Sequence, residues 1–221
     1  GVTDKGVRTA SEFQSALADH EIGPLIGKTV VDRAIVEIAK LNRGRQDKIA
    51  LAINASAGDL LRSKFLERIG DLYRDERERG PITVEITEDV ILDDPDGSLC
   101  RQMEAAGENS NVSFSLDDFG TGYGSLVHVT NLPISEVKVD RRFVAGLKTD
   151  PQKRNVIKGI LGVARSLGLR VVVEGVETPE HVACINALGG QFVQGFFYSQ
   201  AMPFDDLVAI VDEQAKHANA A

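Results

Sequence analysis

Short apolar segments alternate with amphipathic ones along almost the whole chain, and this alternation limits the fold more than any other feature. The segments between the apolar runs show helical spacing, most clearly at Pro24–Leu41, Gly58–Arg77 and Val156–Leu167. Strands that alternate with helices predict an α/β fold with a parallel sheet. Six apolar segments have the length of buried strands: Ile49–Ile53, Ile82–Ile86, Val112–Leu116, Val137–Val139, Leu169–Val173 and Gln191–Val193.

Two architectures are compatible with six parallel strands. An open doubly wound sheet can have six, whereas a closed (β/α) barrel has eight and typically occupies about 250 residues. A length of 221 residues suits one large domain in either case. The choice between them therefore rests on the residues at the strand ends.

The composition excludes several classes of protein. No stretch approaches the roughly 18 apolar residues of a membrane helix, and the first residues lack the pattern of a secretory signal. The net charge of −8 argues against binding to a nucleic-acid polymer, which needs a basic face. Cys100 and Cys184 are the only cysteines, so we expect reduced thiols and a cytoplasmic location.

Each predicted strand carries, near its carboxyl end, a residue that can bind a metal ion, move a proton or make a hydrogen bond. In a barrel these ends share one rim, so the side chains can converge there. Carboxylates held close together repel one another unless cations lie among them. Oxygen ligands without histidine or cysteine favour Mg²⁺ or Mn²⁺ over zinc. The residues are Asn54, Glu85, Asp117, Asp118, Lys138, Glu174 and Gln194.

For any one of these residues a structural role is the simpler interpretation. An acidic residue after a strand is often a helix cap or a turn residue. Asn54 can cap the helix that follows it, and Glu88 can complement a helix dipole. Lys138 is harder to explain in this way, because a charge inside an apolar segment needs an anionic partner. The recurrence of such residues at six strand ends favours a shared site.

The segment DDFGTGYGSL, from Asp117 to Leu126, carries the strongest signal. Adjacent acids at a strand end allow one carboxylate to bridge two metal ions while its neighbour holds the second. The three glycines that follow give the loop unusual backbone freedom. It is not a dinucleotide-binding fingerprint, because Ser125 stands where the third glycine belongs, and no Walker-type phosphate loop is present.

This segment resembles the DDFGTGYSSL signature of EAL domains, with Gly124 in place of a serine. Further segments resemble family motifs in the same order, from about Gly6 to Asp206. They are Asn54–Ser56 (NxS), Glu85–Glu88 (ExTE), Val137–Asp140 (KID), Val173–Thr178 (AEGVET) and Gln194–Phe197 (QGYxF).

The resemblance implies a modified (β/α)₈ TIM-type barrel that hydrolyses cyclic di-GMP to linear pGpG with two Mg²⁺ or Mn²⁺ ions. By position, the first metal ion would be held by Asn54, Glu85 and Asp117. Asp117 would bridge to the second ion with the aid of Asp118. Glu174 would ligate a metal ion or its water and act as general base.

The resemblance implies supporting roles for three more residues. Lys138 would hold the nucleophilic water and offset phosphate charge, and Gln194 would contact water or substrate. Glu88 would anchor the Gly120–Ser125 loop, which lies near a dimer contact in the family. A homodimer and fusion to other signalling domains, in a cytoplasmic or membrane-anchored parent protein, are therefore expected, without membrane contact by this domain itself.

The chain departs from the family pattern in one main respect. It contains no Glu-Ala-Leu, the motif whose glutamate is a metal ligand in the family, and it lacks the arginine that usually follows. We therefore expect residues 1–221 to form a single EAL domain that is incomplete at its amino terminus and lacks the first two strands. A divergent member of the family is the alternative.

Two other functions remain open at this point. A catalytically inactive EAL-type domain could bind cyclic di-GMP as a receptor or scaffold and act through a protein partner. An unrelated barrel enzyme could use Mg²⁺ and a lysine on an enolate-forming substrate. The second alternative does not account for the segment that begins at Asp117.

Overall fold

The computed structural model describes the greater part of the chain. The described residues are 2–3, 6–7, 22–56, 59–60, 64–74, 79–88, 97–109, 112–120, 129–130 and 132–218. Of the Gly120–Ser125 loop, this part of the chain includes only Gly120.

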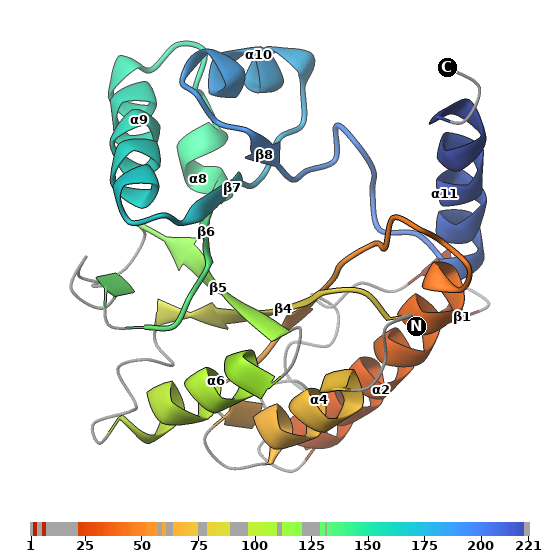
Figure 1. Cartoon of the computed structure of the whole chain (residues 1–221). Coiled ribbons are helices and arrows are strands. Elements are labelled where there is room, and N and C mark those ends of the chain that lie inside the picture. Colours follow the sequence, from red (N-terminus) through yellow and green to blue (C-terminus); the bar gives the residue numbers. More distant parts are fainter. Residues whose placement is uncertain are drawn as a thin grey trace.

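Six parallel strands form one sheet whose spatial order follows the chain, which confirms the six predicted strands. The sheet curls, with helices on its outer side (Figure 1). A doubly wound sheet reverses its strand order at a switch point, and this sheet does not, so the arrangement is that of a (β/α) barrel. The strands are β3 (Leu51–Asn54), β4 (Ile82–Thr87), β5 (Val112–Phe119), β6 (Glu136–Val139), β7 (Arg170–Val173) and β8 (Phe192–Val193).

Helices follow most of the strands. The predicted helices at Pro24–Leu41 and Val156–Leu167 are confirmed, and α4 occupies the middle of the range predicted at Gly58–Arg77. None of the described helices is long and apolar enough to cross a bilayer. Two short strands, β1 (Val2–Thr3) and β2 (Gly6–Val7), pair antiparallel outside the main sheet. The described helices are α2 (Ile22–Asn42), α4 (Phe65–Arg74), α6 (Ser98–Asn109), α8 (Arg141–Val144), α9 (Pro151–Ser166), α10 (Pro179–Ala187) and α11 (Phe204–Ala218).

The two faces of β4 have different chemistry. Ile82, Val84 and Ile86 alternate along the strand and are fully buried in the same apolar core as Leu99 and Met103 of α6. The intervening residues are polar, and they lie in register with polar residues of β5. The register pairs are Thr83 with Ser113, Glu85 with Ser115 and Thr87 with Asp117. On β4 and β5 the outer face therefore packs against the helical layer, and the inner face is polar.

Backbone hydrogen bonds continue beyond the ends of the last strands and keep their polar residues adjacent. The Glu174 N–H donates to Val139 O at 3.0 Å, and the Gln194 N–H donates to Val173 O at 2.9 Å. Gly175 follows with a φ of 72°, where a Cβ atom would lie 2.3 Å from Arg141 Cβ. Only glycine fits this turn, which brings the chain after β7 against the start of α8.

Candidate active site

Lys138 lies at the centre of the carboxyl end of the sheet. Its Nζ is 2.9 Å from Glu85 Oε2, 3.6 Å from Asp117 Oδ1 and 2.6 Å from Glu174 Oε1. These carboxylates belong to β4, β5 and the segment after β7, so the lysine joins three strands besides its own. Its side chain is only 4% exposed. Four residues that were predicted to share a site are thus in contact.

The charge of Lys138 is fixed by these neighbours. Burial alone would lower the pKa of the amine, because a charged group loses hydration. Hydrogen bonds to Glu174 and Glu85, together with the charges of Glu85 and Asp117, outweigh burial and raise the pKa above its ordinary value. The amine is therefore protonated at neutral pH and does not act as a base. One ammonium faces three carboxyl groups, which leaves the cluster with an excess of acid.

Glu85 shows the effect of this excess. Burial is the main cause that raises its pKa, and the charges of Asp117 and Glu174 raise it further. The hydrogen bond and charge of Lys138 act in the opposite direction without cancelling these effects. Carboxyl groups in this state are stabilised as anions when additional cations bind among them.

An irregularity in β5 brings two adjacent carboxylates into the same site. In a regular strand, the side chains of Asp117 and Asp118 would point to opposite faces. The pairing of β5 with β6 shifts register between Leu116 and Phe119, and Asp118 has a left-handed φ of 56°, which is uncommon outside glycine. The Asp118 N–H donates to Asp117 Oδ1 at 2.9 Å. As a result, carboxylate oxygens of Asp117, Asp118 and Glu174 lie within 4.8 Å of one another.

Asp140 belongs to the site, although its position in the sequence predicted no role for it. It follows β6 directly, is 8% exposed, and shares a hydrogen bond with the carboxyl group of Asp118. Burial, this hydrogen bond and the charge of Asp117 raise the pKa of Asp118 to about 6. The available signal was its place in the Val137–Asp140 motif, in which only Lys138 was assigned a function.

Arg142 holds the carboxylate of Asp140. Its backbone N–H and its Nε donate to Asp140 Oδ1 at 2.7 and 2.8 Å. Burial would raise the pKa of Asp140, but the hydrogen bonds from Arg142 more than offset burial and lower it. Asp140 is therefore the ionised partner of its hydrogen bond with Asp118. The same contact makes Asp140 the N-cap of α8.

The remaining predicted residues lie at the same rim with fewer contacts. Asn54 ends β3 in register with Glu85, and Gln194 follows β8 beside Val173. Both are exposed, and within the described ranges their side chains make no hydrogen bond. Glu88 is buried just after β4. Its predicted role as a loop anchor concerns residues outside the described part of the chain.

The donor set fits a hard divalent cation. The close group of Asp117, Asp118 and Glu174 offers three carboxylate oxygens within the span that one ion can bridge at about 2.0–2.6 Å from each. Two further carboxyl groups adjoin it, since Asp140 shares a hydrogen bond with Asp118, and Glu85 contacts Lys138. No histidine or thiol takes part among the described residues of the cluster, so the chemistry favours Mg²⁺ or Mn²⁺ over zinc.

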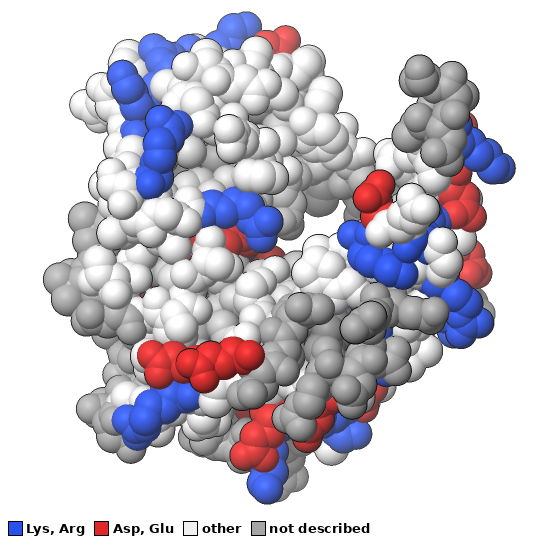
Figure 2. Space-filling view, viewed as in Figure 1, with Lys and Arg blue, Asp and Glu red and all other residues white. Residues whose placement is uncertain are grey.

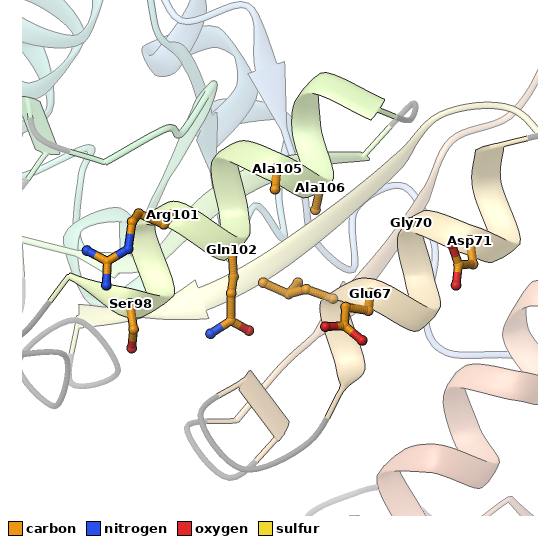
Figure 3. Close-up of a pocket in the computed structure, with 9 residues that line it drawn as sticks. Glu67, Gly70, Asp71, Ser98, Arg101, Gln102, Ala105 and Ala106 are labelled. Atoms are coloured by element: carbon orange, nitrogen blue, oxygen red, sulfur yellow. The ribbon is translucent and has the colours of Figure 1, made fainter.

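A groove of about 610 Å³ lies elsewhere, between α4 and α6 on the outer layer of helices (Figure 3). Its walls carry Glu67 and Asp71 on α4 and Arg101 on α6. None of the strand-end residues lines it. The candidate active site is therefore the carboxylate cluster around Lys138.

A curled parallel sheet with an acidic cluster at its carboxyl rim defines a barrel-type domain with a candidate metal-binding site. Comparison with known proteins places the chain within this class, because the model of the EAL domain family matches residues 3–201. The chain belongs to the EAL domain family. The expectation that residues 1–221 are a single, amino-terminally incomplete domain stays a prediction.

Individual relatives agree with this assignment. The chain is 34% identical over 209 residues to the bifunctional diguanylate cyclase/cyclic di-GMP phosphodiesterase MucR of Pseudomonas aeruginosa, covering 93% of this chain and 30% of MucR. It is 33% identical over 196 residues to the cyclic di-GMP phosphodiesterase PA2567 of the same organism, covering 82% of this chain and 32% of that protein. The chain thus spans about a third of the length of these relatives.

A solved structure supports the fold independently. The PaMucR phosphodiesterase in complex with c-di-GMP superposes with a TM-score of 0.82 at 29% identity, over 92% of this chain and 82% of that one. This agreement confirms the predicted modified (β/α)₈ fold class.

Proposed function

We propose that the chain is a phosphodiesterase domain that hydrolyses cyclic di-GMP to linear pGpG with two Mg²⁺ or Mn²⁺ ions. The single observation that carries this proposal is the contact of Lys138 with Glu85, Asp117 and Glu174 at the rim of the barrel. An ammonium held among carboxylates at this rim can orient a general base and offset charge that develops on a phosphate, as hydrolysis requires. The names of the relatives supply the substrate.

Two groups of ligands would hold the ions. Asn54, Glu85 and Asp117 stand on three adjacent strands and would hold the first ion. Asp117, Asp118 and Glu174 would surround the second, with Asp140 completing the set. When bound, such ions would lower the pKa of water and neutralise charge on the reacting phosphate.

Glu174 is the best placed general base. Of the three carboxylates that contact Lys138 its side chain is the most exposed, at 20% against 16% for Asp117 and 9% for Glu85. Water can therefore reach Glu174, and its carboxylate would accept the proton of the attacking water. The Lys138 ammonium, 2.6 Å from Glu174 Oε1, would orient that carboxylate and offset negative charge that develops on the phosphate.

Hydrolysis of cyclic di-GMP by the full-length natural protein tests the proposal. We expect formation of pGpG with Mg²⁺ or Mn²⁺ and its loss on chelation, followed by chromatography and mass spectrometry. Glu174→Gln keeps the shape of the side chain and removes the base, so we expect turnover to fall by about 100- to 10,000-fold. Glu177→Gln, three residues further on and exposed, is the matched control and should retain activity.

The alternative functions give different results in the same experiment. A receptor would bind cyclic di-GMP with either metal ion and release no pGpG. An enolate-forming enzyme would neither bind nor cleave the nucleotide. Either result would contradict the proposed function.

A further inference from the structure

The candidate active site is acidic, whereas its proposed substrate is a dianion. Carboxyl groups of Glu85, Asp117, Asp118, Asp140 and Glu174 surround it. Lys138 cannot contact a substrate phosphate directly, because its side chain is 4% exposed and its ammonium is engaged by three carboxylates. The proposed metal ions would neutralise the reacting phosphate, and an accessible cationic side chain would add direct hydrogen bonds to the phosphodiester.

Arg142 has the position and exposure for this task. It lies in α8, two residues beyond Asp140, and its side chain is 66% exposed. In the face shown in Figure 2, Lys or Arg side chains lie directly against Asp or Glu side chains at the edge of the central hollow. The guanidinium uses only Nε for Asp140, and within the described residues its two terminal nitrogens have no partner.

The contact with Asp140 also determines where the guanidinium lies. Asp140 shares a hydrogen bond with Asp118, whose carboxylate belongs to the close group with Asp117 and Glu174. The guanidinium therefore contacts one proposed metal ligand, Asp140, and only that carboxylate separates it from Asp118. A guanidinium that is held at Nε presents its other N–H groups as a planar fork, which matches two phosphate oxygens.

We propose that Arg142 is a substrate-binding residue whose terminal N–H groups donate to the non-bridging oxygens of a phosphodiester group of cyclic di-GMP. This inference rests on the proposed function and adds to it the residue that recognises the anion. Asp140 holds the guanidinium in place for this contact.

A purely structural role for the Arg142 side chain makes a different prediction. The helix cap at α8 includes the backbone N–H of Arg142, 2.7 Å from Asp140 Oδ1. This bond persists when the side chain is shortened. Arg142→Ala therefore removes the guanidinium and keeps the helix cap. A loss of substrate affinity in this variant would then come from the guanidinium and not from a damaged cap.

The test is binding of cyclic di-GMP to the full-length protein in a Glu174→Gln background, measured by calorimetry with Mg²⁺. We expect Arg142→Ala to weaken binding by about 10- to 100-fold, as for loss of charge-assisted hydrogen bonds. Arg142→Lys keeps the charge without the planar fork, so its affinity for cyclic di-GMP should lie between that of the background protein and that of Arg142→Ala. Arg141→Ala is the matched control at the neighbouring exposed arginine and should bind like the background protein. Affinity for Mn²⁺ without nucleotide should fall much less than affinity for cyclic di-GMP in Arg142→Ala, because the backbone N–H of Arg142 still holds Asp140.

Two results would overturn the inference while the proposed function stands. One is unchanged nucleotide binding by Arg142→Ala. The other is a loss of Mn²⁺ affinity equal to the loss of nucleotide affinity, which would mean that Arg142 acts on the metal ligands through Asp140. Absence of cyclic di-GMP binding and hydrolysis in the unmodified protein would instead overturn the proposed function, and the inference with it.

Discussion

Lys138 Nζ lies 2.6 Å from Glu174 Oε1, and this contact links β6 to the segment after β7 at the centre of the carboxylate cluster. The lysine contacts Glu85 at a similar distance, so a single ammonium holds the ends of three strands together. Removal of the cation from a buried cluster of this kind leaves the carboxylates with uncompensated charge. Lys138 therefore contributes to stability as well as to the proposed chemistry.

We predict that Lys138→Met destabilises the metal-free protein by about 3 kcal/mol at pH 7, because three carboxyl groups lose their common cation. The raised pKa of Lys138 means that its contribution is present at neutral pH and is lost only as the pH rises through the pKa of the folded state. Thermal unfolding in EDTA measures the loss, and Lys158→Met, on the exposed face of α9, is the control. Equal melting temperatures for the two variants would contradict the prediction.

Metal affinity should depend on the protonation of Asp118. Its pKa of about 6 means that the carboxyl group carries a proton below that pH in the metal-free protein, and a cation must displace this proton. We expect Mn²⁺ affinity to rise from pH 5 to pH 7 and then to level off. The pKa of Asp118 in the folded protein, about 6, lies above its ordinary value of 3.8. The stability of the metal-free protein should therefore fall as the pH rises from 3.8 to about 6, because the folded state binds this proton more tightly than the unfolded state.

The Asp118 prediction is checked by calorimetric titration with Mn²⁺ at several pH values. Asp118→Asn should bind Mn²⁺ more weakly and show little of this pH dependence. Asp47→Asn, at an exposed position before β3, should keep both the affinity and its pH dependence. A wild-type affinity that stays constant from pH 5 to pH 7 would show that the proton on Asp118 does not compete with the ion.

The strands and most of the site could be predicted because both follow from local pattern. Apolar runs mark strands buried on both sides, and parallel strands bring their carboxyl ends together. Lys138 was identified because a charge between two valines needs a partner. The identity of its partners, 53 residues away at Glu85 and 36 at Glu174, became visible only with the sheet register.

The arrangement of other parts of the site depends on tertiary structure. The alternation of side chains along a regular strand places Asp117 and Asp118 on opposite faces of the sheet. The register shift in β5 and the left-handed backbone of Asp118 bring both carboxylates to the same face. Asp140 lies one residue beyond the end of β6, two residues after Lys138, and its contact with Asp118 depends on the pairing of β5 with β6. The exposure of Arg142 likewise cannot be read from its sequence position.

Gly175 should be required for the position of Glu174. Gly175→Ala would place a Cβ atom 2.3 Å from Arg141 Cβ at a φ of 72°, so both overpacking and backbone strain oppose it. We expect a loss of about 3 kcal/mol in stability together with weaker Mn²⁺ binding. Gly146 has a similar φ of 80°, but no atom lies within 4 Å of an added Cβ. Gly146→Ala should therefore lower the stability by only about 1 kcal/mol. Equal losses would mean that contact with Arg141 is unimportant.

The opposite end of the sheet should affect stability without affecting the site. Arg170 Nε lies 2.6 Å from Glu136 Oε2, and its guanidinium stacks over the Phe192 ring at 5.5 Å, which connects the amino ends of β6, β7 and β8. Arg170→Met leaves the buried Glu136 carboxylate without its partner. Since Arg170 is 45% exposed, we expect a loss of only about 1 to 2 kcal/mol.

Because these residues lie at the amino ends of the strands, Mn²⁺ affinity and cyclic di-GMP turnover should be preserved in Arg170→Met below its melting temperature. Arg165→Met, at an exposed arginine with no ion pair among the described residues, is the control and should leave the melting temperature unchanged. Loss of Mn²⁺ affinity in Arg170→Met would show instead that strain at the amino end reaches the carboxylate cluster. Such a result would require β6, which carries both Glu136 and Lys138, to shift along its length as a unit.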